Sequence, residues 1–202
     1  MEFHLIYAGN LIKSGKRNRA WEKHAIRRHF HDQLKRLWEI HPALRYYGDK
    51  TQERDDAGNP IVPPRPFLDV MADNYSQGGI GMIPLITEPN GLVCSLDILL
   101  LRGSRPGTIM EAGGDIDNQV KTLVDALRRP KRGDEMPSKP DDEPTPNPLY
   151  CLLEDDKLIT SLKVKTDRLL FTLDQGQSEA CAVVRVETAQ TDPFGSPWEL
   201  HL

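Results

Sequence analysis

The sequence has few cysteines and no long apolar run. Its three cysteines are widely spaced among 202 residues, and each lies within an apolar stretch. An odd, scattered set of this kind argues against a disulfide framework or a zinc site. The chain also lacks an apolar stretch long enough to cross a bilayer, and its start lacks the basic segment of a signal peptide. We therefore expect a cytoplasmic, soluble protein that does not enter a membrane.

The overall composition is that of a folded domain, but the charge is unevenly distributed. Apolar residues make up 38% of the chain, which is enough for one domain with its own core, so we expect a single domain over residues 1–202. The formal net charge is −4. Residues 13–36, however, carry nine basic residues and only two acidic ones. Net charge is therefore a poor guide to whether one surface meets a nucleic acid.

The periodicity of the apolar residues predicts a mixed α+β domain. Helical patterns occur at 21–46, where Pro42 is expected to bend or stop the helix, and at 117–128. Strand patterns occur at 2–8, 67–75, 80–87, 91–102, 158–171 and 180–188, and the run at 91–102 is apolar enough for a central strand buried on both faces. Polar, proline-rich or aperiodic segments at 48–60, 130–148 and 189–202 indicate a mobile loop or hairpin tip, a long insertion and an irregular tail. We expect a central sheet flanked by the two helices, with acidic residues at one sheet edge.

One stretch, residues 113–127, combines a helical pattern with charged residues. Its apolar residues recur at the spacing of a single buried helix face; they are Val120, Leu123, Val124 and Leu127. Asp117 can cap the start of this helix, because its carboxylate can accept from the unpaired N–H groups of the first turn. Asp117, Lys121 and Asp125 then fall in one row on the polar face. A capping aspartate with an ordinary surface Asp–Lys pair is the simplest interpretation.

Asp115 favours a second interpretation, a metal site. A helix cap does not need it, and two neighbouring carboxylates repel each other unless a cation or a proton lies between them. A second acidic cluster, Glu154-Asp155-Asp156, follows the apolar run at 149–153. Oxygen ligands without a nearby His or Cys favour Mg²⁺, with Mn²⁺ as the alternative. The two acidic stretches together therefore predict a site for a divalent cation.

Three motifs in this region resemble the signature of RusA-type Holliday junction resolvases. They are Gly-Asp-Ile-Asp-Asn-Gln-Val-Lys at 114–121, Leu-Val-Asp-Ala-Leu at 123–127 and Leu-Glu-Asp-Asp-Lys-Leu-Ile at 153–159. The resemblance covers about residues 92–170. It implies a RusA-like mixed sheet and a homodimeric, magnesium-dependent endonuclease of phage or prophage origin that cuts four-way DNA junctions in recombination and repair. The insertion at 130–148 departs from that family, in which the link between helix and acidic pair is short.

The resemblance also assigns roles to individual residues. It makes Asp115, Asp117 and Asp156 the metal-binding acids and Lys121 the essential lysine, with Asp155 and Asn118 in support. A solvated basic face is a common feature of helices, but a basic face can also contact DNA phosphates without reading sequence. Arginines near a metal site can likewise hold a bound phosphate. The candidates for DNA contact are Lys16, Arg17, Arg19, Arg27, Arg28, Arg102 and Arg105.

Two alternatives stay open at this point. The protein could be a non-catalytic DNA-binding or architectural protein whose acids form a structural cation site. It could also be a metal-dependent nuclease that acts on other branched or duplex DNA. Lys121 together with the three acids favours catalysis, because a structural cation site has no need of a lysine.

Overall fold

A computed structural model describes residues 1–11, 19–55, 57–103, 116–136, 144–170 and 179–191. In this part of the chain the protein is a single mixed α+β body with four α-helices, a four-stranded mixed sheet and two small sheets. The α+β prediction is therefore confirmed at this level.

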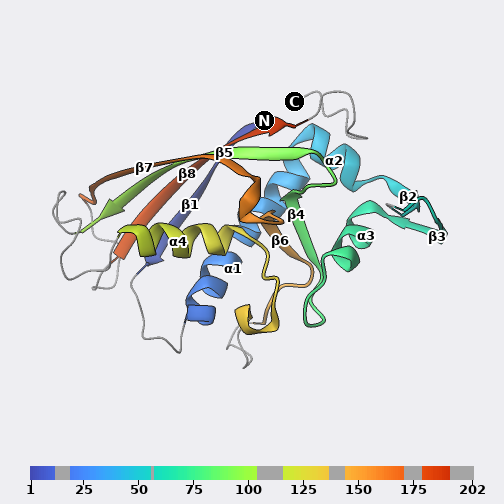
Figure 1. Cartoon of the computed structure of the whole chain (residues 1–202), viewed down its shortest axis with the longest axis horizontal. Coiled ribbons are helices and arrows are strands. Elements are labelled where there is room, and N and C mark those ends of the chain that lie inside the picture. The colour runs from blue at the N-terminus through green and yellow to red at the C-terminus, as the bar shows by residue number, and fades with distance from the viewer. Residues whose placement is uncertain (12–18, 56, 104–115, 137–143, 171–178, 192–202) are drawn as a thin grey trace.

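The elements follow one another as Figure 1 shows. The helices are α1 (Arg19–Ile40), α2 (Pro42–Gly48), α3 (Phe67–Asn74) and α4 (Ile116–Leu127), with short 3-10 turns η1 (Gly133–Glu135) and η2 (Asp156–Leu158). The strands are β1 (Glu2–Asn10), β2 (Thr51–Arg54), β3 (Pro60–Pro66), β4 (Met82–Ile86), β5 (Leu92–Arg102), β6 (Leu149–Leu153), β7 (Ile159–Arg168) and β8 (Glu179–Gln190).

The main sheet has the strand order β1-β8-β5-β7. Strand β8 runs antiparallel to both β1 and β5, whereas β7 runs parallel to β5. A parallel pair needs a long crossover connection, and here the chain between β5 and β7 supplies α4 and β6. The crossover carries both acidic stretches that the sequence analysis singled out.

Strand β5 is central, as predicted, but only one of its faces is fully buried. Leu92, Cys94, Leu96, Ile98 and Leu100 point into the core, while the residues between them are partly exposed. The prediction of burial on both faces is corrected here. The described helices cover one face of the sheet, so the strand alternates in burial although its sequence is almost continuously apolar at 98–101.

The first helix buries an apolar stripe and ends where proline interrupts it. Ile26, Phe30, Leu34 and Trp38 are buried. Helix α1 stops at Ile40, and α2 begins at Pro42, the first helical position, at which proline is well tolerated. The single segment predicted at 21–46 is therefore two helices.

The segment 67–75 was predicted as a strand and is instead helix α3. Phe67, Val70 and Met71 recur at helical spacing, and Val70, Met71 and Ala72 are buried. The polar segment 48–60 contains the predicted hairpin tip, since β2 and β3 pair on either side of it. Of the insertion at 130–148 and the tail at 189–202, residues 137–143 and 192–202 lie outside the described part.

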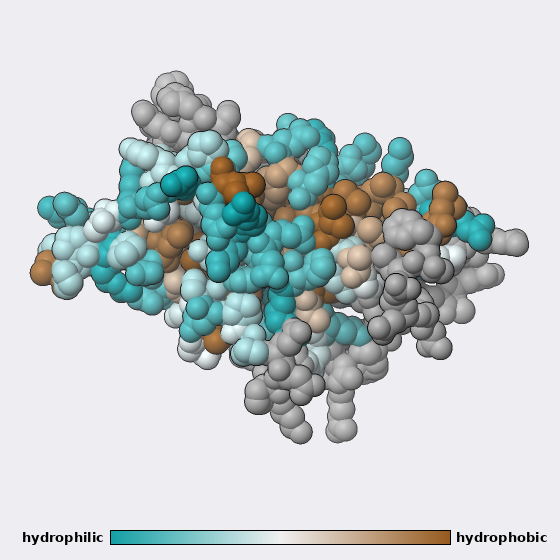
Figure 2. Space-filling view, turned by 180° about the vertical axis from the view of Figure 1, so that it is seen from behind, coloured by the Kyte–Doolittle hydropathy of each residue, from teal (hydrophilic) through white to brown (hydrophobic). Residues whose placement is uncertain are grey.

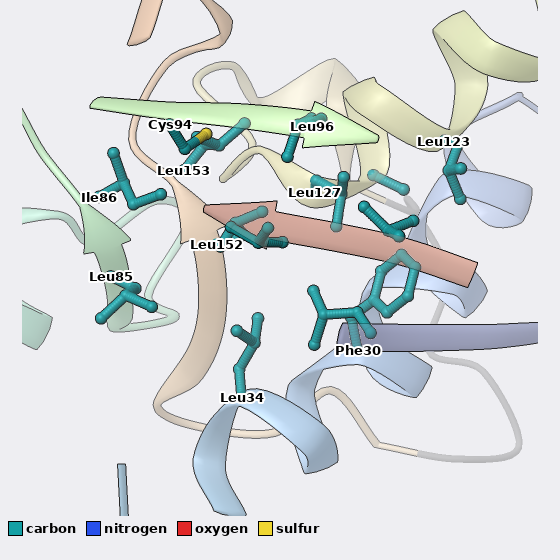
Figure 3. Close-up of a cluster of buried hydrophobic side chains, with 14 of the residues drawn as sticks. Phe30, Leu34, Leu85, Ile86, Cys94, Leu96, Leu123, Leu127, Leu152 and Leu153 are labelled. Carbon is teal, nitrogen blue, oxygen red and sulfur yellow. The ribbon is translucent and has the colours of Figure 1, made fainter. Parts of the chain in front are cut away.

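The core lies between the main sheet, helices α1 and α4, and the parallel pair β4–β6. Figure 3 shows side chains from all of these elements meeting, among them Phe30 and Leu34 of α1, Leu123 and Leu127 of α4, and Leu152 and Leu153 of β6. Residues that are apolar on one helix face or on alternate strand positions supply this contact. The core therefore fixes α4 against β6, and so sets the positions of Asp117 on the helix and of the acidic residues that follow β6.

The surface seen from behind is mostly hydrophilic. Apolar side chains gather there mainly on the half of the molecule that holds the main sheet (Figure 2). Among the described residues, no helix is both long enough and apolar enough to cross a membrane.

Candidate functional site

Helix α4 presents its first charged residues to solvent. Asp117 lies in the first turn and is exposed, and Lys121 is exposed one turn later. Asn118, predicted to support the site, is partly buried, and its main-chain oxygen accepts a hydrogen bond from Thr122 Oγ1 at 2.7 Å. The apolar face of α4 is turned to the core. The helix therefore leaves the carboxylate of Asp117 and the ammonium group of Lys121 accessible to a ligand.

Asp125, the third member of the predicted row, has a structural task. Its carboxylate forms an ion pair with Lys23 of α1, and both side chains are largely shielded from solvent. The row of charges thus divides, with its first two members open to solvent and its third joining two helices.

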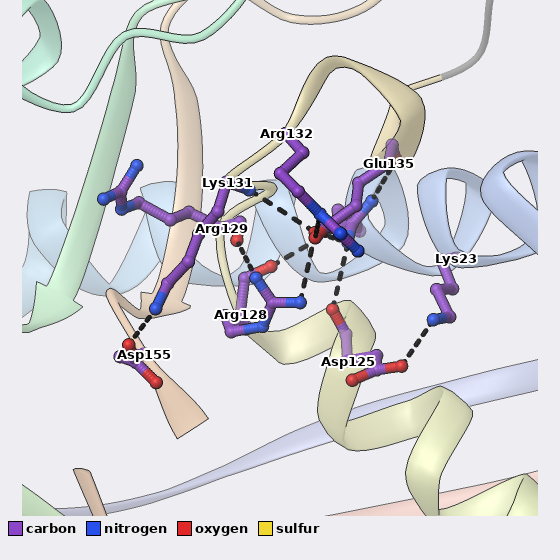
Figure 4. A network of polar contacts seen from close by, with 9 residues as sticks. Lys23, Asp125, Arg128, Arg129, Lys131, Arg132, Glu135 and Asp155 are labelled. Atoms are coloured by element: carbon purple, nitrogen blue, oxygen red, sulfur yellow. Dashed lines mark hydrogen bonds and ion pairs between the residues drawn. The ribbon is translucent and has the colours of Figure 1, made fainter. Parts of the chain in front are cut away.

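The second acidic stretch forms a tight turn after β6. Asp155 caps η2, where its Oδ1 accepts from the main-chain N–H of Lys157 at 3.1 Å. Its other carboxylate oxygen pairs with Lys131, as Figure 4 shows. Asp156, the next residue, is exposed. Asp155 therefore holds the shape of the turn, while Asp156 faces solvent.

Glu154 joins the same turn to the connection between β4 and β5. Its Oε2 accepts from the main-chain N–H of Glu88 at 3.0 Å, and Lys157 forms an ion pair with the Glu88 carboxylate. Gly91 closes the β4–β5 connection with a positive φ of 61°, a conformation that glycine adopts without strain. We call residues 154–157 the acidic turn; it is held from two sides.

The charges around Lys131 are of both signs. Burial is the main cause that lowers the pKa of Lys131, and the neighbouring Arg128 and Arg129 act in the same direction. The carboxylates of Asp156 and Glu154 oppose this shift. The amine is thus close enough to interact with the whole acidic turn.

The acidic turn is anchored at the C-terminal end of α4. The main-chain N–H of Arg129 donates to the carbonyl oxygen of Leu153 at 2.9 Å, and Arg128 forms a parallel bridge with Leu153. Asp117 comes eleven residues before Arg128, a rise of about 16 Å at 1.5 Å per helical residue. Asp117 and the anchor of the acidic turn therefore lie at opposite ends of α4, with Lys121 between them.

The predicted metal-binding triad cannot be assembled from the described residues alone, because Asp115 lies outside them. Among the residues that are described, no group of three or more His, Cys, Asp or Glu side chains is arranged to hold a metal ion. The site of Asp115, Asp117 and Asp156 therefore stays a prediction.

A buried arginine fixes the C-terminal end of α4. Arg27 of α1 is 2% exposed and donates three hydrogen bonds to main-chain oxygens: from Nε to Arg128 at 3.2 Å, from Nη1 to Glu135 at 3.1 Å and from Nη2 to Asp125 at 3.1 Å. The last carbonyls of a helix have no partner within the helix, and a cation near them is favourable. Arg27 meets both needs.

Glu135 gathers further arginines around this contact (Figure 4). Its carboxylate lies 3.1 Å from Arg128 Nη2 and 3.5 Å from Arg132 Nε. The sequence patterns indicated only the end of a helix at 128 and an insertion from 130 in this region. One signal in the sequence could have identified this cluster. Four basic residues occur within five positions at the end of a helical pattern, in Arg128-Arg129-Pro130-Lys131-Arg132.

The structure separates the residues predicted to contact DNA. Arg27, buried and bonded to three carbonyls, is not free to meet a phosphate, so the structure assigns it another task. Arg28 and Arg102 are partly buried, and Arg102 ends β5. Arg19 begins α1. Lys16, Arg17 and Arg105 lie outside the described residues.

Compared with family models, curated proteins and solved structures, the chain matches none of them.

Proposed function

We propose that the protein is a magnesium-dependent endonuclease that acts as a homodimer and cuts branched DNA, with four-way junctions as its main substrate. One observation carries the proposal. Helix α4 exposes Asp117 and Lys121 in one row near its start, and the turn that exposes Asp156 is anchored beyond the C-terminal end of the same helix through Arg129 and Leu153. The resemblance of these same segments to RusA-type resolvases supports it.

The side chains suit a hard divalent cation by their chemistry. Asp115, Asp117 and Asp156 would hold the ion, all three ligands are carboxylates, and the two that are described are exposed. When bound, Mg²⁺ supplies the Lewis acidity and positive charge that favour attack of water on a phosphodiester.

The chain's own residues have distinct tasks in this proposal. Lys121 places an ammonium group where it can stabilise negative charge that develops on the phosphate. Asp155 keeps the acidic turn in shape through Lys131 and Lys157, and Arg27 keeps α4 in place. Selectivity comes from the shape of the branched substrate, since phosphate contacts position a protein without reading bases.

A homodimer serves this function in two ways. Two copies related by a two-fold axis present two sites to the two strands that a symmetric junction offers. In addition, Asp117 and the anchor of the acidic turn are separated by about 16 Å along α4 within one chain. We infer that a second chain can bring its own Asp156 to the Asp117 end.

A mixing experiment decides between a site within one chain and a site shared between two. Purified Asp117→Asn and Asp156→Asn proteins are mixed and allowed to exchange subunits, and cleavage is measured. With a shared site, each mixed dimer has one site that carries both substitutions and one intact site, so activity returns. With a site inside each chain, every site keeps one substitution and the mixture stays inactive.

The nuclease proposal itself is tested with three DNA substrates. Four-way, flap and linear duplex DNA are incubated with the protein in Mg²⁺ or Mn²⁺. We expect preferential cutting of the four-way substrate, and a loss of about 10²–10³ in rate for Asp117→Asn and Lys121→Met. Asp32→Asn is the matched control, because Asp32 is an exposed aspartate of α1 that is not part of the candidate site.

The outcomes separate the proposal from its alternatives. If folded protein binds DNA but cuts none of the substrates with either ion, the nuclease proposal is overturned and the architectural alternative is favoured. Equal cutting of flap or linear DNA keeps the nuclease and rejects the junction as its main substrate.

A further inference from the structure

A pocket of about 250 Å³ lies on the side of the molecule that holds α2, α3 and the β2–β3 hairpin (Figure 1). Its lining is aromatic and amide-rich with one cation: it includes Tyr47, Lys50, Gln52, Phe67, Asn74 and Tyr75. The candidate metal site uses none of these residues.

The lysine at this pocket is held close to aromatic rings. Lys50 Nζ lies 4.6 Å from the ring centre of Tyr47, which lines the pocket, and 4.3 Å from that of its neighbour Tyr46. A cation over the face of an aromatic ring is attracted by the ring's electrons. The amine is therefore fixed beside the pocket, where an anionic group of a ligand can meet it.

Two sets of contacts connect the pocket to the acidic turn and to α4. Tyr75, on one wall, carries the guanidinium of Arg129 over its ring at 5.1 Å, and the N–H of Arg129 bonds to Leu153 just before the acidic turn. Pro89 and Asn90, on another wall, directly follow Glu88, whose carboxylate forms an ion pair with Lys157. The pocket is therefore connected by two sets of contacts to the acidic turn, which carries Asp156.

The size and chemistry of the pocket restrict its ligand. Pockets for drug-sized molecules measure about 300–1,000 Å³, so a volume of 250 Å³ suits one small ring system and not a base pair. Aromatic side chains stack on unpaired bases of every type, and amide side chains can bond to base edges. A lysine beside them suits the phosphate of the same nucleotide.

We propose that this pocket binds one unpaired nucleobase of the DNA substrate, close to the phosphate that is cut. The proposal rests on the proposed function and adds a specificity site to it. Tyr47, Phe67 and Tyr75 hold the base between apolar surfaces, Gln52 and Asn74 face its polar edge, and Lys50 meets the adjoining phosphate. An aromatic peptide side chain could use the same rings, but it brings no phosphate for Lys50.

The test is a binding measurement without metal, so that no cutting is needed. Single-stranded DNA of five nucleotides is titrated, in buffer that contains EDTA, into the unchanged protein and into three tyrosine variants. We expect Tyr47→Leu to weaken binding about tenfold or more, because a stacked base is lost. Tyr47→Phe, which keeps the ring, should restore the affinity. Tyr46→Leu is the matched control, because it also removes a ring that contacts Lys50 but leaves the pocket lining unchanged, so the difference between the two leucine variants measures the loss of the stacked base.

A second measurement uses a four-way junction that carries one abasic position, moved step by step around the branch point. The proposal is supported if an abasic residue at one position lowers the affinity or moves the cleavage site, and if the same abasic residue has no such effect on Tyr47→Leu. Equal affinity of Tyr47→Leu and Tyr46→Leu for the oligonucleotides overturns it, as does binding of tyrosine-containing pentapeptides in their place.

These results are independent of the nuclease test. Tyrosine-dependent binding by a protein that never cuts DNA rejects the proposed function and leaves the base pocket. Junction cutting that is unaffected by Tyr47→Leu rejects the pocket and leaves the nuclease.

Discussion

Arg27 and Asp125 are joined by a hydrogen bond of 3.1 Å from the Arg27 guanidinium to the main-chain oxygen of Asp125, across 98 positions of sequence. The bond ties the middle of α1 to the last turn of α4. Lys23, one turn before Arg27 on α1, pairs with the Asp125 side chain. One residue of α4 is therefore held through both its main chain and its side chain, and the helix that carries Asp117 and Lys121 is fixed at its far end.

We predict that Arg27→Met lowers the free energy of unfolding by about 2–4 kcal/mol. The substitution leaves buried carbonyl oxygens without donors, and each such group costs about 1–3 kcal/mol. Urea denaturation followed by circular dichroism measures the change. Arg36→Met is the matched control on the same helix, because Arg36 pairs with Glu39 at the surface, where an ion pair contributes at most about 1 kcal/mol. Equal effects of the two substitutions would contradict the capping role.

We predict that Lys131→Met raises the affinity of the protein for divalent cations at the proposed site, to which the acidic turn contributes Asp156. Lys131 pairs with Asp155 and lies within the field of Asp156 and Glu154, so its amine competes with a bound ion for the same negative charge. Without it, the carboxylates repel each other more strongly and a cation relieves that repulsion. Calorimetric titration with Mn²⁺ measures the affinity.

The control for this substitution is Lys163→Met. Lys163 also pairs with an aspartate, Asp97, but on the main sheet away from the acidic turn. Its removal should leave Mn²⁺ binding unchanged. A weaker affinity in Lys131→Met would mean that the lysine organises the turn for the ion and does not compete with it.

The elements that sequence patterns predicted well are those with one strong period. Helix α4 was expected at 117–128 and is found at 116–127, because its apolar stripe has a single helical period. Asp117 lies within the first turn of the helix and not at the cap position predicted for it. Segment 67–75 was predicted wrongly, because Phe67, Leu68 and Val70 suit a strand by propensity while Val70, Met71 and Ala72 gain burial only as a helix. Tertiary burial decided between them.

The candidate site shows the same limit. The exposed row of Asp117 and Lys121 follows from helical spacing alone. The burial of Arg27 does not, because its partners lie about a hundred residues further along the chain and no local pattern marks them. An arginine in a basic segment is normally solvated, and only the position of α4 in space gives this one buried acceptors.

We predict that two of the three thiols are protected from alkylation or disulfide exchange until the protein unfolds. Burial raises the pKa of Cys94 to about 12 and that of Cys151 to about 12. At pH 8 the reactive thiolate of both is therefore scarce as well as inaccessible. The reaction with an aromatic disulfide reagent is followed by absorbance. In native protein we expect the thiol of Cys181 to react first, and in guanidinium we expect all three thiols to react.

Cys181→Ser is the variant that identifies the faster thiol. Burial also raises the pKa of Cys181, but this residue lies on the less covered face of the main sheet, opposite Ala8 and Leu101. The substitution should remove the first phase and leave the slow one. A first phase that persists would show that Cys94 or Cys151 becomes accessible without global unfolding.

We predict that His31 makes the fold less stable in mild acid. Its Nδ1 accepts from the main-chain N–H of Tyr150 at 3.0 Å, which requires the neutral ring. Burial lowers the pKa of His31 below its usual 6.5, an effect that Lys35 reinforces and Asp32 opposes. Below pH 6.5 the unfolded chain therefore binds the proton more readily than the folded one. Stability is fully present above that pH and is lost as the pH falls toward the lowered pKa.

The substitution that isolates this effect is His31→Asn, since the asparagine oxygen can accept from the Tyr150 N–H and does not titrate. The urea concentration at the midpoint of unfolding is measured at pH 7.5 and 5.5. Its decrease between the two pH values should be smaller for His31→Asn than for the unchanged protein. His4→Asn, an exposed position on β1, should follow the unchanged protein at both pH values. The same fall in all three proteins would show that the acid sensitivity arises elsewhere, with His41 the next residue to test, because burial lowers its pKa as well.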